Sequence, residues 1–269
     1  MEENDAYILG TDQEELRRLE IQHKVWQSEA KRGWKLADFK AGDNILDLGC
    51  GPGYCSVELA SIVGNTGEIM CVDRSDGFIK YLEHIKDQKV LPIKPILSTF
   101  DKLSLEDESL DGIYCRWALA WVPNPKEILQ KVKTYLRPGS KIVIQEYYYW
   151  NSHRTQPEKP YLKKAISAAL KSFKESESEI DVGKHLHQWF DELGMKIINA
   201  RLMPKLATPN STVWKWPRTF YESYFPRLIK MGYLTEQDME NAFNDLESLE
   251  RIPYATLWAP LMIEVVAEK

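Results

Sequence analysis

Three glycines at alternate positions, Gly49, Gly51 and Gly53, directly follow a short apolar run at 44–48. Glycine allows tight turns and lets a ligand approach the main chain where a Cβ would block it. The helix expected from Tyr54 offers unpaired N–H groups and the positive end of its dipole. This spacing therefore predicts a turn that holds a carboxylate or a phosphate.

An acidic residue, Asp73, stands at the end of a second apolar run, 68–72, twenty residues after Gly53. At the tip of a second strand, its carboxylate is placed to accept hydrogen bonds from two ribose hydroxyls, and its charge disfavours a 2′-phosphate. Loop and acid together indicate a nucleoside cofactor. The alternative is a structural turn in which Asp73 serves only as a cap.

Short apolar runs alternate with helical patterns and predict the elements that position these residues. The strands are expected at 44–48, 68–72, 94–97, 112–115 and 141–147, with helices at 54–63, 75–85 and 125–136. This alternation predicts right-handed crossovers and a mostly parallel sheet. Two late strands, 195–202 and 256–267, complete a doubly wound α/β fold with seven strands.

Three segments describe the expected domain organisation of the 269 residues. Residues 1–40 form a helical N-terminal lid, and residues 41–150 form a Rossmann-like cofactor-binding core. Residues 151–269 complete the sheet and carry helical cap insertions near 157–193 and 210–250. The length suits one α/β domain with sizeable insertions.

The glycine loop differs from the dinucleotide fingerprint G-x-G-x-x-G, because Tyr54 stands where that motif needs a small residue. Over about residues 40–150 the chain resembles class I S-adenosylmethionine-dependent methyltransferases. The resemblance rests on the G-x-G-x-G stretch 46–53 with Asp47 inside the strand, and on the segments 104–111, 121–125 and 136–140. It looks nearest to small-molecule enzymes of the kind that includes quinone-biosynthesis methyltransferases.

The resemblance implies S-adenosylmethionine as the cofactor and a set of residues that contact it. The glycines would line its methionine part, Asp73 would hold the ribose, and Arg74 and Ser75 would flank the adenine. The expected cofactor residues are Asp47, Gly49, Cys50, Gly51, Gly53, Asp73, Arg74, Ser75, Thr99, Phe100, Arg116 and Trp117.

Two of these positions carry alternatives. The family often has an acid after strand three, and here that position falls on Thr99, beside Phe100, which either stacks on the adenine or packs in the core. Arg116 pairs with the cofactor carboxylate or an acidic substrate, or else makes a surface ion pair.

Aromatic residues late in the chain and near its start predict an apolar acceptor pocket with a few polar groups. Core packing is the alternative for each one. The expected substrate contacts are Tyr7, Trp26, Tyr147, Tyr149, Trp216, Arg218 and Tyr221. The chemistry would be in-line displacement at a methyl group, and Glu146 and His153 are the candidate bases if the acceptor must lose a proton.

Composition excludes several classes of function. A net charge of −5 without a basic stripe gives no sign of nucleic-acid binding. No apolar run approaches the ~20 residues that span a bilayer, and the acidic N-terminus lacks a secretory signal, so we expect a cytoplasmic protein. His185 and His187 lack ligand partners in the sequence, so we expect no metal. A small-molecule substrate is expected, and a homodimer stays open.

Three other functions remain as alternatives. The first is a regulatory protein that binds the cofactor without turnover. The second is an NAD-dependent oxidoreductase, which would need the longer glycine spacing. The third is a macromolecular methyltransferase, which is disfavoured because residues 115–118 read Cys-Arg-Trp-Ala where an Asn-Pro-Pro-aromatic motif would stand.

Overall fold

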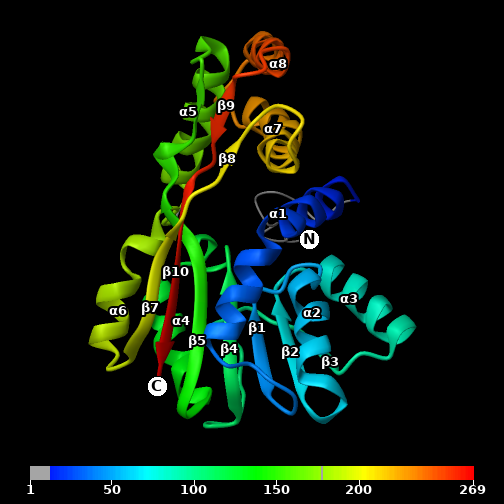
Figure 1. Cartoon of the computed structure of the whole chain (residues 1–269), viewed down its shortest axis with the longest axis vertical. Helices are drawn as coiled ribbons and strands as arrows, with labels where there is room; N and C mark the ends of the chain where they lie inside the picture. The colour runs from blue at the N-terminus through cyan, green and yellow to red at the C-terminus, as the bar shows by residue number, and fades with distance from the viewer. Residues whose placement is uncertain (1–12, 177) are drawn as a thin grey trace.

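The computed structural model describes residues 13–176 and 178–269. Its centre is a seven-stranded sheet in the order β3-β2-β1-β4-β5-β10-β7 (Figure 1). The strands are β1 Asn44–Leu48, β2 Glu68–Asp73, β3 Ile93–Leu97, β4 Leu110–Arg116, β5 Leu136–Tyr149, β7 Lys196–Met203 and β10 Leu261–Glu268. The first five are parallel, and β10 runs antiparallel to both β5 and β7. The predicted fold class is confirmed.

The crossover helices begin where local signals place them. They are α2 Tyr54–Val63, α3 Asp76–Lys89, α4 Pro125–Tyr135 and α6 Leu186–Glu192. The Ser75 hydroxyl accepts the Phe78 amide at 3.2 Å and caps α3. Pro125 opens α4, where a missing N–H costs nothing. These starts put the ends of β1, β2 and β4 at one edge of the sheet.

A second layer of helices stands beyond the carboxyl ends of the strands (Figure 1). It contains α5 Pro160–Glu175, α7 Thr212–Lys230 and α8 Glu236–Glu250. The long first helix, α1 Gln13–Leu36, packs against α7 and α2. Because α1 reaches both the sheet domain and this upper layer, it lies beside the edge where the site residues gather.

The end of the chain differs from the prediction. Residues 256–267 were expected to form one strand, but they form β9 Thr256–Trp258 and β10, separated by a break at Pro260. Proline cannot donate a ladder hydrogen bond, which explains the break. β9 joins β6 Arg154–Gln156 and β8 Leu206–Ala207 in a small antiparallel sheet that the sequence did not predict.

Candidate cofactor and acceptor site

The glycine loop between β1 and α2 has all three glycines at positive φ: 78° at Gly49, 53° at Gly51 and 82° at Gly53. A Cβ on Gly49 would lie 2.3 Å from the Cβ of Ala118, and one on Gly53 would lie 2.3 Å from Leu82. A Cβ on Gly51 would meet no described atom within 4 Å. Packing therefore requires the outer glycines, whereas Gly51 leaves open space beside the main chain.

Asp73 organises this loop. Its Oδ2 accepts the Gly51 amide at 2.8 Å, and its Oδ1 accepts the Ser75 amide at 2.9 Å. Burial is the largest influence on its carboxyl and raises its pKa, although the backbone amides oppose that shift. The carboxylate still lines the cavity, where its remaining lone pairs suit ribose hydroxyls.

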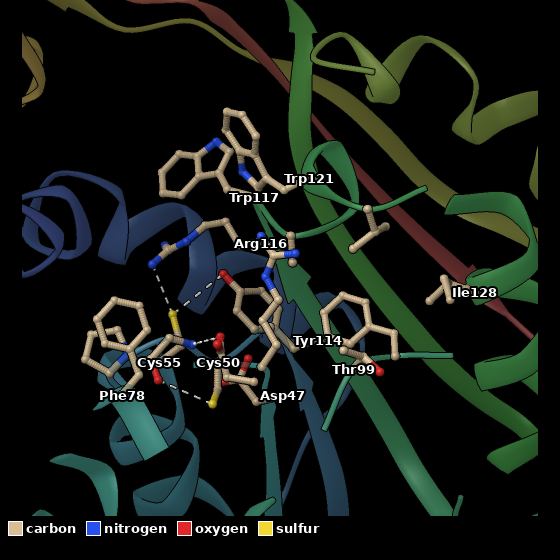
Figure 2. A pocket seen from close by; sticks show the side chains of 18 of the residues that line it. Asp47, Cys50, Cys55, Phe78, Thr99, Tyr114, Arg116, Trp117, Trp121 and Ile128 are labelled. Atoms are coloured by element: carbon tan, nitrogen blue, oxygen red, sulfur yellow. Dashed lines mark hydrogen bonds between the residues drawn. The ribbon is translucent and has the colours of Figure 1, made fainter. Parts of the chain in front are cut away.

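A cavity of about 510 Å³ opens at this edge of the sheet. Its volume falls within the roughly 300–1,000 Å³ of small-molecule sites. All the predicted cofactor residues line it except Gly53, which packs on Leu82, and Ser75, which caps α3 (Figure 2). Within β1, Asp47 accepts the Ser56 hydroxyl at 2.6 Å, and burial raises the pKa of Asp47 to about 6.

The cavity is also lined by His23, from the expected N-terminal lid, and by Tyr54, Cys55, Asp101, Tyr114 and Trp121, none of which was predicted to bind the cofactor. Asp101 supplies a carboxylate two residues after Thr99, where the family's acid was expected. The remaining residues gave no local signal, because their approach depends on the packing of α1, α2 and β4.

Helix α1 places the side chain of His23 in the wall of the larger cavity. His23 Nε2 lies 3.0 Å from Glu58 Oε1, and Nδ1 lies 3.6 Å from Cys55 Sγ and 3.3 Å from Arg116 Nη2. A guanidinium only donates, so Nδ1 accepts and Nε2 carries the proton toward Glu58. Burial, followed by the charge of Arg116, lowers the pKa of His23, so the ring is neutral at pH 7.

Arg116 supplies a buried positive charge at the cavity wall. Its Nη2 donates to Cys55 Sγ at 3.1 Å, and its Nη1 has no hydrogen-bond partner among residues 13–176 and 178–269. Figure 2 shows the guanidinium beside Cys55 and below Trp117. A buried cation is stable when an anionic group pairs with it. The donor thus fits a carboxylate such as that of S-adenosylmethionine or of an acidic acceptor.

A smaller pocket of about 30 Å³ adjoins the cavity and shares Gln22, Trp117 and Trp121 with it. Trp117 and Trp216 stack at 5.8 Å, and Trp26 meets both rings edge-on, at 5.5 and 5.2 Å. Trp216 Nε1 donates to Gln22 at 2.8 Å. Of the predicted substrate residues, Tyr147 and Trp216 line this pocket, and Trp26 packs behind it.

A methyltransferase-domain family model matches residues 39–197, more than half of the chain and including the glycine loop, Asp73 and Arg116. The chain belongs to this family. The prediction of a class I S-adenosylmethionine-dependent methyltransferase is confirmed, and with it the cofactor, whose nucleoside and carboxylate the glycine loop, Asp73 and Arg116 fit.

Among curated relatives, the chain is similar to the demethylmenaquinone methyltransferase of Staphylococcus saprophyticus. The two are 29% identical over 150 residues, which cover 56% of this chain and 60% of the relative. The match thus spans about three fifths of the relative's length.

Two solved structures share the fold. One is a candidate methyltransferase from Bacillus halodurans, 12% identical with a TM-score of 0.62, covering 90% of this chain and 99% of that one. The other is a geranyl diphosphate methyltransferase in complex with GPP and sinefungin, 13% identical with a TM-score of 0.57, covering 91% and 79%.

Several predicted substrate residues lie away from both cavities. Tyr149 is 42% exposed on the surface. Arg218 pairs with Glu250 at 2.6 Å and with Glu222 at 2.9 Å. Tyr221 is buried behind the smaller pocket. None of these three side chains lines either cavity: Tyr149 faces solvent, ion pairs hold Arg218, and Tyr221 packs in the core. Tyr7 lies outside the described residues.

His153 is also corrected as a candidate base. It borders the smaller pocket, but its Nδ1 lies 2.7 Å from the Trp258 carbonyl and its Nε2 lies 2.6 Å from the Tyr221 hydroxyl. A carbonyl only accepts, so Nδ1 donates and Nε2 accepts from Tyr221. Burial lowers the pKa of His153 to about 4. Because both ring nitrogens are hydrogen-bonded, the ring links the start of β6 to β9 and α7.

Glu146 at the end of β5 is the second candidate base that the geometry corrects. Its side chain is fully buried and is not part of the cavity wall. Its Oε1 accepts the amides of Ala118 and Leu119, both at 2.8 Å. Burial raises the pKa of Glu146 to about 8. The carboxyl therefore accepts hydrogen bonds from the loop after β4 and does not face the cavity.

Two further findings concern metal binding and membrane spans in residues 13–176 and 178–269. In that part of the chain, no group of three or more His, Cys, Asp or Glu side chains is arranged to hold a metal ion. Among the same residues, no helix combines the length and apolar character needed to span a membrane.

Proposed function

We propose that this methyltransferase transfers a methyl group from S-adenosylmethionine to a small, apolar or aromatic molecule. The observation that carries the proposal is the shared wall of the two cavities. Gln22, Trp117 and Trp121 border the cofactor cavity on one side and the aromatic pocket on the other. The smaller pocket, at about 30 Å³, has room for only one end of an acceptor, so the rest of the acceptor would lie in the larger cavity against Trp117 and Trp121, next to the cofactor's reactive end.

The residues of the chain supply binding and orientation. S-adenosylmethionine, when bound, supplies an electrophilic methyl group on a sulfonium. Asp73 fixes the nucleoside end, the main chain around Gly51 lines the methionine part, and Arg116 pairs with a carboxylate. The rings of Trp117 and Trp121 exclude water and hold the acceptor in line, so that proximity provides most of the rate enhancement.

The helices that cover the site complete this proposal. Helix α1 contributes Leu19, Gln22 and His23 to the cavity wall, so we assign it as a lid. We assign α7 as part of the acceptor cap, because it places Trp216 and Phe220 on the aromatic pocket. The name of the curated relative, a demethylmenaquinone methyltransferase, supports a small ring-containing acceptor.

His23 is the cavity-lining residue best suited to take a proton from the acceptor. Its neutral ring is oriented by Glu58, and its Nδ1 lone pair faces Arg116. A bound carboxylate that draws Arg116 toward itself would free this lone pair. We therefore propose His23 as the base for acceptors that must lose a proton.

Transfer of labelled methyl from S-adenosylmethionine into a fractionated cell extract tests the proposed function, with Asp73→Ala as the control. Label in the small-molecule fraction that disappears in the variant supports it. Label in protein or RNA would overturn the acceptor class. Cofactor binding without label in any fraction would favour the regulatory alternative.

A further inference from the structure

The loop Arg116–Trp121 after β4 forms the wall between the two cavities. Its second residue, Trp117, has a φ of 54°, in the left-handed region that non-glycine residues rarely adopt. The Trp117 amide donates to the Gln145 carbonyl at 3.1 Å, and its indole Nε1 lies 3.0 Å from Met262 Sδ. Such a conformation persists only where the surroundings hold it.

Glu146 fixes the backbone that follows Trp117. Its Oε1 accepts two consecutive amides, those of Ala118 and Leu119, which directly follow the strained residue. The side chain is completely buried, and its Oε2 has no hydrogen-bond partner in the described chain. One buried oxygen thus satisfies two amides that would otherwise lack partners, and it fixes the direction of the turn.

The same turn touches the glycine loop. Ala118 packs so closely on Gly49 that a Cβ there would lie 2.3 Å from its own Cβ. A shift of residues 117–119 would therefore move both the stacked pair Trp117–Trp216 and the loop that holds the cofactor. The position of Glu146 is coupled to both cavities, although it lines neither of them.

We propose that Glu146 is a positioning residue, which holds Trp117 between the cofactor cavity and the acceptor pocket through its acceptor oxygen rather than through proton transfer. Glutamine keeps an oxygen at this place and cannot act as a base. Alanine removes the oxygen. Of the measurements below, only the methyl-transfer assay depends on the proposed function.

The experiment uses the full chain labelled with 5-fluorotryptophan and followed by ¹⁹F NMR. Trp117→Phe assigns the Trp117 resonance by its loss. We expect Glu146→Gln to leave that resonance in place and Glu146→Ala to shift or broaden it. Asp111→Ala is the matched control, because Asp111 also accepts a backbone amide, that of Asn44 at 2.8 Å, at the opposite end of β4. A Trp117 resonance that Glu146→Ala leaves unchanged would overturn the proposal, as would one that Asp111→Ala moves equally.

A second readout separates positioning from catalysis. S-adenosylhomocysteine affinity by calorimetry and methyl transfer into the extract are measured for each variant. Glu146→Gln should keep both within about twofold of wild type, whereas Glu146→Ala should lower transfer at least tenfold. A Glu146→Gln protein that binds S-adenosylhomocysteine normally, keeps its Trp117 resonance and loses transfer would make Glu146 the base and overturn the proposal. If wild type itself shows no transfer, the proposed function fails while the NMR comparison still decides the role of Glu146.

Discussion

The side chain of Asp73 accepts a hydrogen bond from the amide of Gly51 at 2.8 Å, which joins the tip of β2 to the loop between β1 and α2. The residue expected to bind the ribose therefore also shapes the loop expected to hold the methionine part. A single carboxylate couples the two halves of the cofactor site.

Replacement of Asp73 by alanine should weaken S-adenosylmethionine binding about tenfold to 150-fold. A hydrogen bond to a charged group contributes about 1.5–3 kcal/mol, and each 1.4 kcal/mol is tenfold in affinity. Calorimetric titration measures the change, with Asp76→Ala as the control, because Asp76 is an exposed carboxylate that pairs with Lys80. Equal affinities for Asp73→Ala and wild type would rule out the ribose assignment.

Gly51→Val should abolish cofactor binding, because its side chain would enter the open space beside the loop. A control for backbone strain is Gly194→Val, since Gly194 has a φ of 66° and equally free surroundings. Both variants should lose about 1–2 kcal/mol of stability from the left-handed conformation. Thermal unfolding compares the stability of the two variants, and calorimetry compares their affinity for S-adenosylmethionine. Normal binding by Gly51→Val would show that the cofactor does not lie against Gly51.

His153→Gln should make the protein less sensitive to acid. Since the folded-state pKa of His153, about 4, lies below its unfolded value near 6.5, wild type loses stability as the pH falls from about 6.5 through 4. The slope for one proton is at most about 1.4 kcal/mol per pH unit. Urea unfolding between pH 4 and 7 measures it, with His84→Gln as the exposed control. If the stability of His153→Gln depends on pH in the same way as that of wild type, the lowered pKa of His153 is contradicted.

Glu146→Gln should make the stability of the protein less sensitive to a rise in pH. The folded-state pKa of Glu146, about 8, is raised above its unfolded value near 4.3, so the unfolded chain ionises first. Its contribution to stability is fully present below about pH 4.3 and is lost as the pH rises through 8. The variant should therefore flatten the decline of stability between pH 5 and 8 in urea titrations. Glu83→Gln, at an exposed position, is the control. If the stability of Glu146→Gln declines with rising pH as steeply as that of wild type, a group other than Glu146 causes the decline.

Trp216→Leu should impair acceptor use while leaving cofactor affinity unchanged. The ring stacks on Trp117 and lines the aromatic pocket, but it is not part of the larger cavity wall. At saturating S-adenosylmethionine, methyl transfer should fall at least tenfold, because the acceptor loses an aromatic contact and the support of Trp117. Trp189→Leu, on α6, serves as the control. A weakened cofactor affinity in Trp216→Leu would show that Trp216 also supports the cofactor cavity through Trp117.

The sequence allowed the cofactor half of the site to be predicted because its signals are local. The glycine spacing, the strand before it and Asp73 lie within thirty residues, and each is fixed by backbone geometry. The candidate bases failed for the opposite reason. Whether Glu146 faces a cavity or a buried loop depends on β4 packing beside β5, and the partners of His153 come from β9 and α7.

Contacts between distant segments also explain what was missed. His23 reaches Glu58 and Arg116 only because α1 folds back across α2 and β4. The small sheet β6-β9-β8 escaped prediction because its strands are two or three residues long, too short for a periodic pattern.

The antiparallel strand β10 has a consequence for synthesis of the protein. It fills the gap between β5 and β7, and its partners on β5 precede it by more than a hundred residues. During translation, β5 therefore emerges long before its neighbour and presents an open edge of buried-type residues such as Val143 and Ile144. Unpaired edges of this kind recruit other chains. Until residues 261–268 are available to pair with β5, this edge must be covered in another way, or it can pair with other chains.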